Sequence, residues 1–404
     1  GDASTRGAGH DQDAEAAPVV RLVNRVLADG VRGDASDIHV EPFADRVQLR
    51  YRIDGVCHVM EQIPKRTQAA VIARLKIPQD GRIKIKVDKK VYDMRFSTCP
   101  CYYGESIVMR ILRPEAARMG LEKLGMREET LNDLNETIRK PNGVFLVTGP
   151  TGSGKTTTLY SALDVLNRPD KKIITAEDPV EYNFPGINQC QVNPDVGMTF
   201  DKILRAMLRQ APNIVLVGEI RDKEVGQVAI EAALTGHLVF STLHTNDAPS
   251  SLTRMIDMGL KPFLVASAVQ AVLAQRRVRV LCPDGKEIDP EPDRHQLRLC
   301  GFTADEIQGA ETYRAVGCEN CGDTGYKGRR GIYEFMKMNG PLRELAFKRA
   351  PVSQIRKTAI DSGMQNLLHD GKYKILSGLT TPTEIAKIAQ VEGVVDDADE
   401  EDEE

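Results

Sequence analysis

One eight-residue stretch of this 404-residue chain has the residue types and spacing of a phosphate-binding loop. It reads GPTGSGKT over residues 149–156 and satisfies the pattern G-x4-G-K-[ST]. Glycines in such a loop let backbone N–H groups converge on a β-phosphate, and the following helix N-terminus adds positive potential. The lysine reaches the β- and γ-phosphates, and the last hydroxyl binds Mg²⁺. We therefore predict a site for a nucleoside triphosphate with Mg²⁺. Thr156 is the expected magnesium ligand, and the predicted nucleotide contacts in this loop are Gly149, Thr151, Gly152, Ser153, Gly154, Lys155, Thr156 and Thr157.

Two acidic residues closely follow apolar runs that are typical of strands buried on both faces. Glu219 comes two residues after the run at 214–217, and Glu177 comes directly after 172–176. Ligands of open α/β sheets gather at the carboxyl ends of the strands, so both carboxylates are expected near the phosphate loop. We predict that Glu219 is the general base or positions the attacking water, and that Glu177 is the second catalytic carboxylate. The three acids among residues 177–181 would by themselves also fit a solvated turn.

Three further residues are candidates for sensing the state of the nucleotide. His237 and His244 bracket an apolar run that begins at Leu238. A single histidine is more often structural than functional, but His244 would face the γ-phosphate from the carboxyl end of this strand. Arg209 lies in a predicted helix and is a candidate partner for Glu219 or for phosphate.

Strand and helix patterns alternate through the middle of the chain. Continuous apolar runs indicate buried strands, and segments with helical periodicity lie between them. This alternation predicts a mostly parallel sheet with helices on its faces, which is an α/β core over residues 143–280. The expected strands are 144–147, 172–176, 214–217 and 238–240, and the expected helices are 156–167, 200–210 and 223–234.

A small α+β domain is predicted over residues 18–114. Helical spacing of apolar residues at 18–28 and 68–77 accompanies segments with the period-two alternation of strands, and Asp54-Gly55 is a hairpin signal. The expected strands are 47–53, 56–59, 82–87, 91–97 and 106–112. Five arginines lie on these strands, and they form either a solvated sheet face or a surface that faces a phosphate. They are Arg50, Arg52, Arg82, Arg95 and Arg110.

The remaining segments are less regular. We predict, in chain order, a mobile arm or artificial extension at 1–17, a charged connector containing a helix at 115–142, a cysteine-containing subdomain at 281–335, a helical subdomain at 336–393 and an acidic tail at 394–404. The tail is expected to be solvated and structureless, with a regulatory or partner-binding role as the alternative.

Composition narrows the class of protein. No apolar stretch approaches the roughly 20 residues of a membrane helix and no export signal is present, so we expect a soluble protein whose membrane role comes through partners. Residues 1–17 carry a net charge of −3 and residues 396–404 carry −8. Because the whole chain has a net charge of −4, residues 18–395 carry +7, which suits anionic ligands without requiring nucleic acid. The eight cysteines are better explained as thiols or metal ligands than as disulfides.

Four core segments occur in fixed order. They read GPTGSGKTTTLYSAL, ITAEDPVEY, LRQAPNIVLVGEIRD and AALTGHLVFSTLHTNDAPSSLTRM. These segments closely resemble the secretion ATPase family that drives type II secretion and type IV pilus assembly, in which they are the Walker A motif, the aspartate box, the Walker B motif and the histidine box. The upstream segments SDIHVEP, YRIDG and PQDGRIKIKV resemble the family's PAS-like N-terminal domain.

The resemblance implies a RecA-like P-loop ATPase that works as a ring-shaped homohexamer. Nucleotide would lie between the two domains of a chain, and Arg82 and Arg95 match the arginines that reach it from the N-terminal domain. Glu177 and Glu219 match the acidic catalytic pair. The resemblance also implies a cytoplasmic location, peripheral to the inner membrane through a platform and recruiting proteins, and no nucleic-acid partner.

The chain departs from the family pattern in its metal-binding segment. An assembly ATPase normally carries two C-x-x-C pairs that bind structural zinc. The pair Cys318–Cys321 is intact, but the first pair reads Cys282-Pro-Asp-Gly285, which leaves three thiolates where Zn²⁺ takes four ligands. Structural Zn²⁺ is therefore an open possibility, with Cys300 or a water as the fourth ligand and a metal-free remnant as the alternative.

Two further departures concern the N-terminal region. The family usually has an extra helical stretch where Ile77 here runs directly into Pro78, which affects the expected geometry around Arg82. A large platform-binding domain usually precedes the segment that begins here at Pro18, and we expect it to be absent from this chain.

The leading interpretation is an assembly motor, and three alternatives stay open. The first alternative is a pilus retraction ATPase of the same superfamily, since such motors resemble the core of this chain but lack the cysteine-containing segment. A RecA-like nucleic-acid motor would show salt-dependent DNA binding. A nucleotide-gated scaffold would bind ATP without useful turnover, and its ATPase rate would not depend on Glu219.

Overall fold

The computed structural model describes residues 8–75, 81–113 and 119–391. The chain divides into two compact units, residues 1–114 and residues 115–404, and each unit is described by itself. The Ile77–Pro78 junction and the predicted acidic tail at 394–404 lie outside the described residues. In the ranges that are described, no helix is both long and apolar enough to span a bilayer.

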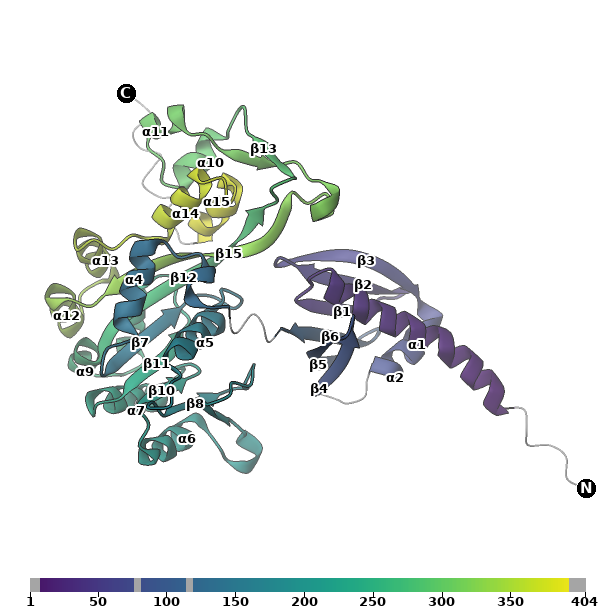
Figure 1. The fold of residues 1–404 in the computed structure, drawn as a ribbon, viewed down its shortest axis with the longest axis horizontal. Coiled ribbons are helices and arrows are strands. Elements are labelled where there is room, and N and C mark those ends of the chain that lie inside the picture. Colours follow the sequence, from purple (N-terminus) through teal and green to yellow (C-terminus); the bar gives the residue numbers. More distant parts are fainter. Residues whose placement is uncertain (1–7, 76–80, 114–118, 392–404) are drawn as a thin grey trace, which may run out of the picture. The chain divides into compact units, whose positions relative to one another are not determined.

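The N-terminal unit is a six-stranded antiparallel sheet with two α-helices (Figure 1). The strand order across the sheet is β3-β2-β1-β6-β5-β4. Asp54 and Gly55 both have positive φ, as the predicted two-residue hairpin between β2 and β3 requires. The elements are α1 (Ala8–Arg32), β1 (Asp37–Pro42), β2 (Arg46–Ile53), β3 (Val56–Pro64), η1 (Lys65–Thr67), α2 (Gln68–Leu75), β4 (Arg82–Val87), β5 (Lys90–Cys101) and β6 (Gly104–Leu112).

Alternation along these strands separates an apolar face from a polar face. Apolar strand residues such as Val40, Leu49 and Met109 form one buried cluster with residues of α1 and α2, including Leu27 and Ile72. The alternate residues, which include the strand arginines, lie on the other face of the sheet. The sheet therefore has one helix-covered side and one polar side.

The first helix begins earlier than predicted. We expected residues 1–17 to form a mobile arm, but α1 begins at Ala8 and includes Pro18. Residues 8–17 contain four alanines, and alanine has the highest intrinsic helix propensity. Residues 1–7 lie outside the described ranges.

The second unit is built on a seven-stranded sheet of order β15-β12-β7-β11-β10-β8-β9. Six of these strands are parallel, and only β15 runs antiparallel, to β12. The predicted α/β class is therefore confirmed. The sheet strands are β7 (Gly143–Thr148), β8 (Ile173–Glu177), β9 (Asn188–Gln191), β10 (Ile214–Val217), β11 (Leu238–Leu243), β12 (Val269–Leu281) and β15 (Tyr326–Lys337).

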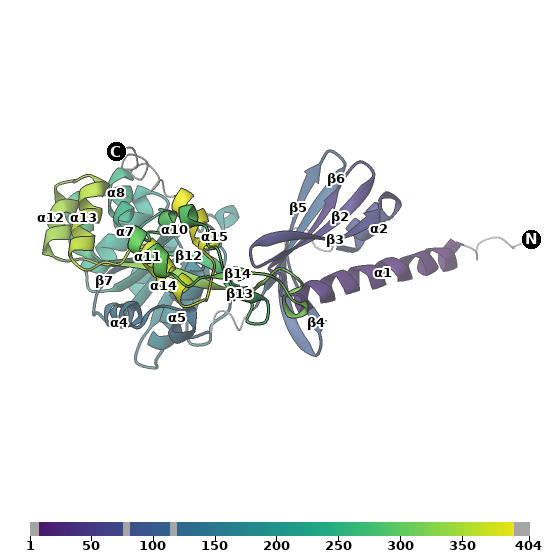
Figure 2. The same ribbon diagram turned by 90° about the horizontal axis from the view of Figure 1, so that it is seen from above.

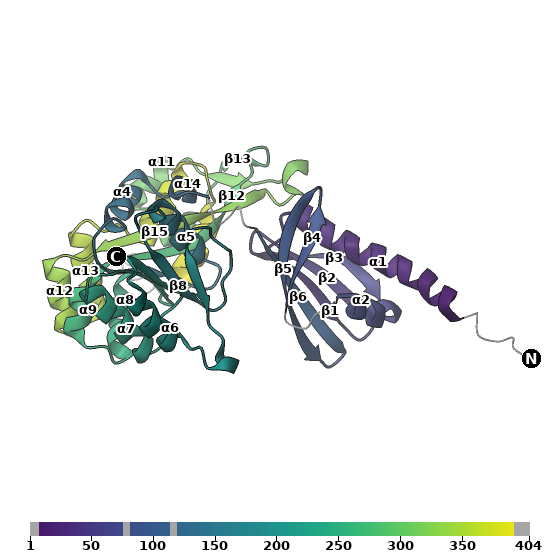
Figure 3. The same ribbon diagram turned by 60° about the horizontal axis from the view of Figure 1, so that its bottom comes forward.

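Helices cover both faces of this sheet (Figures 2 and 3). Val144 and Leu146 of β7 face one buried cluster, with residues of α6, α7, α8, α9, α12 and α13, whereas Phe145 and Val147 face the other, with residues of α4 and α5. The helices are α4 (Glu128–Thr137), α5 (Lys155–Leu166), α6 (Phe200–Met207), α7 (Lys223–Leu234), α8 (Pro249–Asp257), α9 (Pro262–Ala268), α12 (Gly340–Phe347) and α13 (Val352–Asp361).

A smaller cluster joins the segments predicted as separate cysteine-containing and helical subdomains. Leu297, Phe302, Leu367 and Ile385 meet in it, and Val278 contributes from β12. The remaining elements are η2 (Leu121–Leu124), η3 (Pro194–Val196), η4 (Leu208–Gln210), β13 (Lys286–Ile288), α10 (Arg294–Leu299), α11 (Ala304–Gly309), β14 (Tyr313–Ala315), η5 (Glu319–Cys321), α14 (Leu367–Leu376) and α15 (Pro382–Val391).

Two predicted boundaries differ from the structure. The core sheet does not end at residue 280, because β15 pairs with β12 along most of its length. The described part of the predicted connector, residues 119–142, belongs to the core, because Leu121, Leu134 and Ile138 are buried in the same cluster as Phe145. In both cases, segments outside the alternating strand and helix pattern belong to the core because their apolar side chains are buried in it.

Candidate nucleotide-binding and catalytic site

The phosphate-binding loop joins a fully buried strand to a helix. All six residues of β7 are buried, the loop follows, and α5 begins at Lys155. Gly149, Gly152 and Gly154 have φ values of 144°, 83° and 95°, which residues with a Cβ rarely adopt. At Gly149, a Cβ would lie 2.4 Å from the backbone oxygen of Gln275. The loop conformation therefore favours glycine at all three positions, and the close approach of β12 also requires it at Gly149.

Lys155 is held at this loop by main-chain carbonyls. Its Nζ donates to the backbone oxygens of Gly149 at 2.7 Å and Pro150 at 3.2 Å. Burial lowers the pKa of Lys155 to about 8, a shift that the nearby Glu219 opposes and Arg276 reinforces. A partly desolvated ammonium group gains more than an exposed one from an incoming polyphosphate.

The carboxyl ends of parallel strands bring the predicted residues to one pocket. β8, β10, β11 and β7 are neighbours in the sheet and point the same way. Their ends deliver side chains to a pocket beside the start of α5, as expected for an open α/β sheet. The predicted residues that line it are Lys155, Thr156, Glu177, Glu219 and His244, together with Asp178 and Glu181 of the aspartate box.

Glu177 is held rigidly by three side-chain donors. The residue is 4% exposed, and its carboxylate accepts hydrogen bonds from Tyr160 Oη, from Thr175 Oγ1 at 2.6 Å and from Gln189 Nε2 at 3.1 Å. Burial raises the pKa of Tyr160, and the adjacent Glu177 raises it further, so the phenol stays protonated and donates. This network was not apparent in the sequence, because its members come from three separate elements, α5, β8 and β9.

Replacing Tyr160 with phenylalanine is expected to destabilise the second unit by about 1–2 kcal/mol, because Glu177 Oε2 loses a buried donor. It should also lower the ATPase rate, since the carboxylate is then free to move. Chemical denaturation monitored by circular dichroism tests the first effect, with Tyr373→Phe, at an exposed tyrosine of the same unit, as the matched control. Unfolding midpoints that match between the two variants would contradict the proposed network.

Glu219 contacts a cation and an imidazole. One carboxylate oxygen forms an ion pair with Arg221, and the other lies 3.6 Å from His244 Nε2. Arg221 also lies 3.9 Å from Asp178, and its hydrogen bond to Glu219 raises the pKa of its guanidinium. Burial lowers the pKa of His244, with Lys155 adding to the effect, so the ring is neutral at pH 7. A neutral imidazole beside Glu219 can accept or donate a hydrogen bond as the nucleotide changes.

Two predicted sensor residues do not reach this pocket. His237 precedes β11, at the end of that strand opposite His244, and its Nδ1 donates to the Ala232 carbonyl at 2.9 Å. Arg209 is exposed, and its guanidinium donates to the Arg205 carbonyl at 2.9 Å. The proposed pairing of Arg209 with Glu219 is therefore wrong within this chain. Arg221 takes that place, and its position two residues after Glu219 in GEIRD was the available signal.

Gln275 is a second residue that sequence reasoning missed. It is 1% exposed on β12, its Nε2 donates to the Ser153 carbonyl at 2.8 Å, and its Oε1 accepts from Thr158 Oγ1 at 2.9 Å. Gln275 therefore ties the phosphate-binding loop to the first turn of α5. A lone glutamine in the apolar stretch VLAQ was the only sign of this role.

In the N-terminal unit, strand register aligns four of the five predicted arginines in one row, and the fifth, Arg50, instead pairs with Glu41. Arg82 is the partner of Arg95, Arg95 of Arg110, Arg110 of Asp37, and Asp37 of Arg52. Directly opposed residues share a face of the sheet. Asp37 Oδ1 accepts from Arg110 Nε at 3.0 Å, and its other oxygen lies 3.6 Å from Arg52 Nε, whereas Arg95 is exposed.

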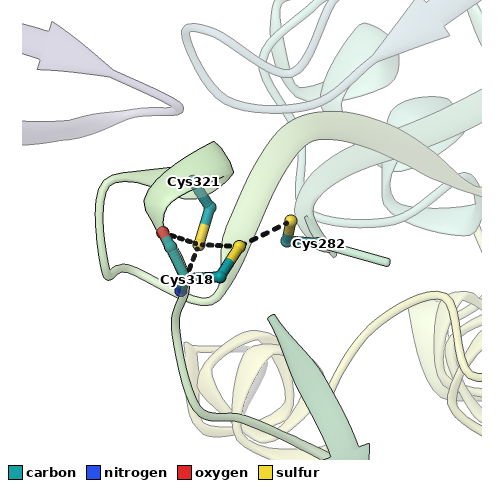
Figure 4. A group of neighbouring side chains, drawn as sticks. All are labelled: Cys282, Cys318 and Cys321. Atoms are coloured by element: carbon teal, nitrogen blue, oxygen red, sulfur yellow. Dashed lines mark hydrogen bonds between the residues drawn. The ribbon is translucent and has the colours of Figure 1, made fainter. Parts of the chain in front are cut away.

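The cysteine segment brings the three predicted zinc ligands together. The Sγ atoms of Cys282, Cys318 and Cys321 all lie within 4.8 Å of one another (Figure 4). Cys300 does not join them, because its buried thiol donates to the Pro382 carbonyl at 3.3 Å inside an apolar cluster. Burial there raises the pKa of Cys300 to about 12. The suggestion that Cys300 completes a metal site is therefore wrong.

Comparison with known proteins identifies relatives along most of the chain. The type IV pilus assembly ATPase PilB of Myxococcus xanthus is 46% identical over 384 residues, which cover 92% of this chain and 68% of the relative. The type II secretion system protein E of Pseudomonas aeruginosa is 46% identical over 388 residues, which cover 93% and 76%.

Solved structures agree with this assignment at the level of the fold. The crystal structure of the pilus retraction motor PilT with bound ADP has a TM-score of 0.61 at 25% identity, covering 90% of this chain and 96% of that one. The ATPase DotB of Legionella pneumophila has a TM-score of 0.67 at 19% identity, covering 96% and 98%. Residues 12–391 match the model of the family described as type II/IV secretion system protein. With this match and relatives at 46% identity along nine-tenths of its length, the chain belongs to the type II/IV secretion system protein family.

Proposed function

We propose that this chain hydrolyses ATP as the motor of type IV pilus assembly or of pseudopilus extension in type II secretion. One observation carries the proposal: Lys155, Thr156, Glu177 and Glu219 line a single pocket at the carboxyl edge of the parallel strands. The relatives that match this chain at 46% identity are named for these two systems.

In this mechanism the chain supplies positioning and electrostatic stabilisation. The loop N–H groups and Lys155 hold the β- and γ-phosphates. Thr156 would hold Mg²⁺, and the ion would supply positive charge that stabilises the phosphates. Glu219 orients the attacking water and accepts its proton. Glu177, fixed by its three donors, supplies a second carboxylate in the same pocket. His244 contacts Glu219 and is placed to respond to the γ-phosphate.

Sequence similarity favours assembly over retraction. The assembly ATPase PilB of Myxococcus xanthus is 46% identical to this chain, whereas the retraction motor PilT is 25% identical. The cysteine cluster of this chain also lies in a segment that the sequence analysis assigned to assembly motors rather than retraction motors.

We propose further that the active form is a homohexamer on the cytoplasmic side of the inner membrane. The arginine row of the N-terminal unit, with Arg82 and Arg95 at one end, supplies positive charge to the nucleotide. Platform and recruiting proteins of the machine connect the ring to the membrane, and nucleic acid is not a partner.

The experiment that tests the motor is the ATPase rate per protomer as a function of protein concentration. We expect the rate to rise as the ring assembles, and Arg95→Ala to lower the plateau on the order of 10³-fold, as for arginine fingers. Arg66→Ala, at an exposed arginine of the same unit outside the row, is the matched control. A rate per protomer that stays constant while sedimentation shows assembly would exclude a role for the ring.

A further inference from the structure

The three clustered cysteines lie on two turns of matching geometry. In the turn Cys318–Cys321, the Cys321 N–H donates to the Cys318 carbonyl at 3.1 Å. In the turn Cys282–Gly285, the Gly285 N–H donates to the Cys282 carbonyl, also at 3.1 Å. The Cys282 N–H donates to the Gly325 carbonyl at 2.9 Å, and the Gly325 N–H donates to Cys321 Sγ at 3.2 Å, so Gly325 links the two turns. Gly285 therefore occupies the place that the second cysteine of a C-x-x-C turn would hold.

The sulfur atoms are arranged as metal ligands. Cys318 Sγ lies 3.7 Å from Cys282 Sγ and 3.6 Å from Cys321 Sγ, between the two as Figure 4 shows. Cys321 Sγ also accepts from the backbone N–H groups of Cys318 and Gly325, each at 3.2 Å. Donors of this kind stabilise a thiolate and orient it toward a metal.

The side chain that Gly285 lacks would point at the sulfur triangle. A Cβ at this position would lie 3.1 Å from Cys321 Sγ and 3.3 Å from Cys318 Sγ. Gly285 does not have a positive φ, so its backbone conformation is open to other residues, and a Cβ there would also lie 3.2 Å from the carbonyl carbon of Gly317, which must shift slightly. The Gly285 carbonyl accepts from Val316 N at 3.0 Å and Gly317 N at 3.1 Å, which holds the turn in place.

No other protein group supplies a fourth ligand in the described part of the chain. The Cys300 thiol lies in an apolar cluster and donates to the Pro382 carbonyl. Asp284 Oδ2 accepts a hydrogen bond from Asn320 Nδ2 at 2.9 Å. Across the described ranges, no further cysteine, histidine or carboxylate joins the group of three. Cys282 is fully buried, but Cys318 and Cys321 are partly exposed, so solvent reaches the cluster from their side.

We propose that Cys282, Cys318 and Cys321 bind a zinc-type divalent ion as three thiolates with an open fourth position. That position takes an exchangeable ligand from solution, which is water in a buffer without thiols. Closed structural zinc sites use four protein ligands, and an open position is typical of sites where an outside molecule coordinates. The proposal concerns a site separate from the nucleotide pocket and does not depend on ATP hydrolysis.

Cobalt substitution of the 404-residue chain tests this directly, because Co²⁺ takes the same ligands as Zn²⁺ and reports them by absorption. With a phosphine as the reductant, we expect one Co²⁺ per chain and a charge-transfer band from three thiolates. Adding a small thiol or azide should change the spectrum of the parent protein, because the ligand enters the open position.

Substitutions at residue 285 provide matched variants. Gly285→Cys should give about one third more thiolate charge-transfer intensity, a spectrum that no longer responds to added ligand, and zinc retention at least about 10-fold tighter against a chelator. Gly285→Ala adds the Cβ without a thiol and should show neither gain. Circular dichroism verifies that each variant is folded.

Three results would overturn the proposal. The first is a reduced parent protein that binds no Co²⁺ or Zn²⁺ at equimolar concentration. The second is a parent spectrum that does not respond to added thiol or azide. The third is a loss of charge-transfer intensity in Cys300→Ala, which would make Cys300 the fourth ligand.

Discussion

Replacing Lys155 with alanine is expected to weaken Mg²⁺–ATP binding by about 10²-fold or more and to abolish measurable hydrolysis. The ammonium group lies on the loop carbonyls of Gly149 and Pro150, where it can turn to the β- and γ-phosphates. A charge-assisted contact of this kind is worth about 1.5–3 kcal/mol, and Lys155 makes more than one with a polyphosphate. Titration calorimetry measures binding, and phosphate release measures turnover. Lys171→Ala, at an exposed lysine of the same unit, is the matched control.

The depressed pKa of Lys155 gives this experiment a pH signature. Below its pKa of about 8 the group is an ammonium ion, and above it the free protein increasingly holds a neutral amine. Bound polyphosphate favours the charged form, so binding must take up a proton as the pH rises through 8, and affinity should weaken there by up to about tenfold per pH unit. In Lys155→Ala, ATP affinity should not show this additional loss as the pH rises through 8. Binding by Lys155→Ala that equals the parent at every pH would contradict the assignment of the loop.

Replacing Glu219 with glutamine is expected to leave ATP bound but to lower its turnover by about 10²–10³-fold. Glutamine keeps the shape of the side chain but cannot accept the proton of the attacking water. The binding loop and Lys155 are unchanged in this variant, so ATP affinity should stay close to that of the parent. Single-turnover hydrolysis and recovery of intact ATP from the isolated complex separate the two effects.

Glu224→Gln is the control for charge removal in this variant. Glu224 lies in the exposed first turn of α7 and does not line the pocket. Since Arg221 and His244 both contact Glu219, removing either of them together with Glu219 should add little further loss. An unchanged rate in Glu219→Gln would instead favour the nucleotide-gated scaffold.

Much of the fold could be predicted where the sequence pattern is local. The expected strands 82–87 and 214–217 and the expected helix 223–234 have the observed bounds. β12 was not among the expected strands, because Arg276, Arg277 and Arg279 interrupt the apolar character of the segment Val269–Leu281. Arg276 donates to the Gln275 and Asn246 carbonyls, and Arg279 pairs with Glu384, and these contacts form only in the folded chain. β1 was overlooked although DIHVEP alternates in the manner of a strand.

Residues of the candidate site could be predicted where a local sequence pattern shows both the type of side chain and its place at the edge of the sheet. Glycines and Lys155 form a contiguous motif, and Glu177 and Glu219 lie at strand ends, so topology alone places them together. Tyr160, Gln189 and Gln275 act through contacts between distant elements, and no local pattern marks such contacts. His237 was a candidate only because it lies near the same strand as His244, but opposite ends of one strand face opposite edges of the sheet.

The strand β12 connects two parts of the molecule that no motif links. Gln275 near its middle holds the Ser153 carbonyl, and Cys282 directly follows its last residue, Leu281. The seven residue-to-residue steps from Gln275 to Cys282 span roughly 23 Å in extended conformation, and a strand hydrogen-bonded to β15 resists compression. A rearrangement of the phosphate-binding loop on nucleotide exchange would therefore displace β12 along its axis, and the displacement would reach the cysteine cluster that follows the strand.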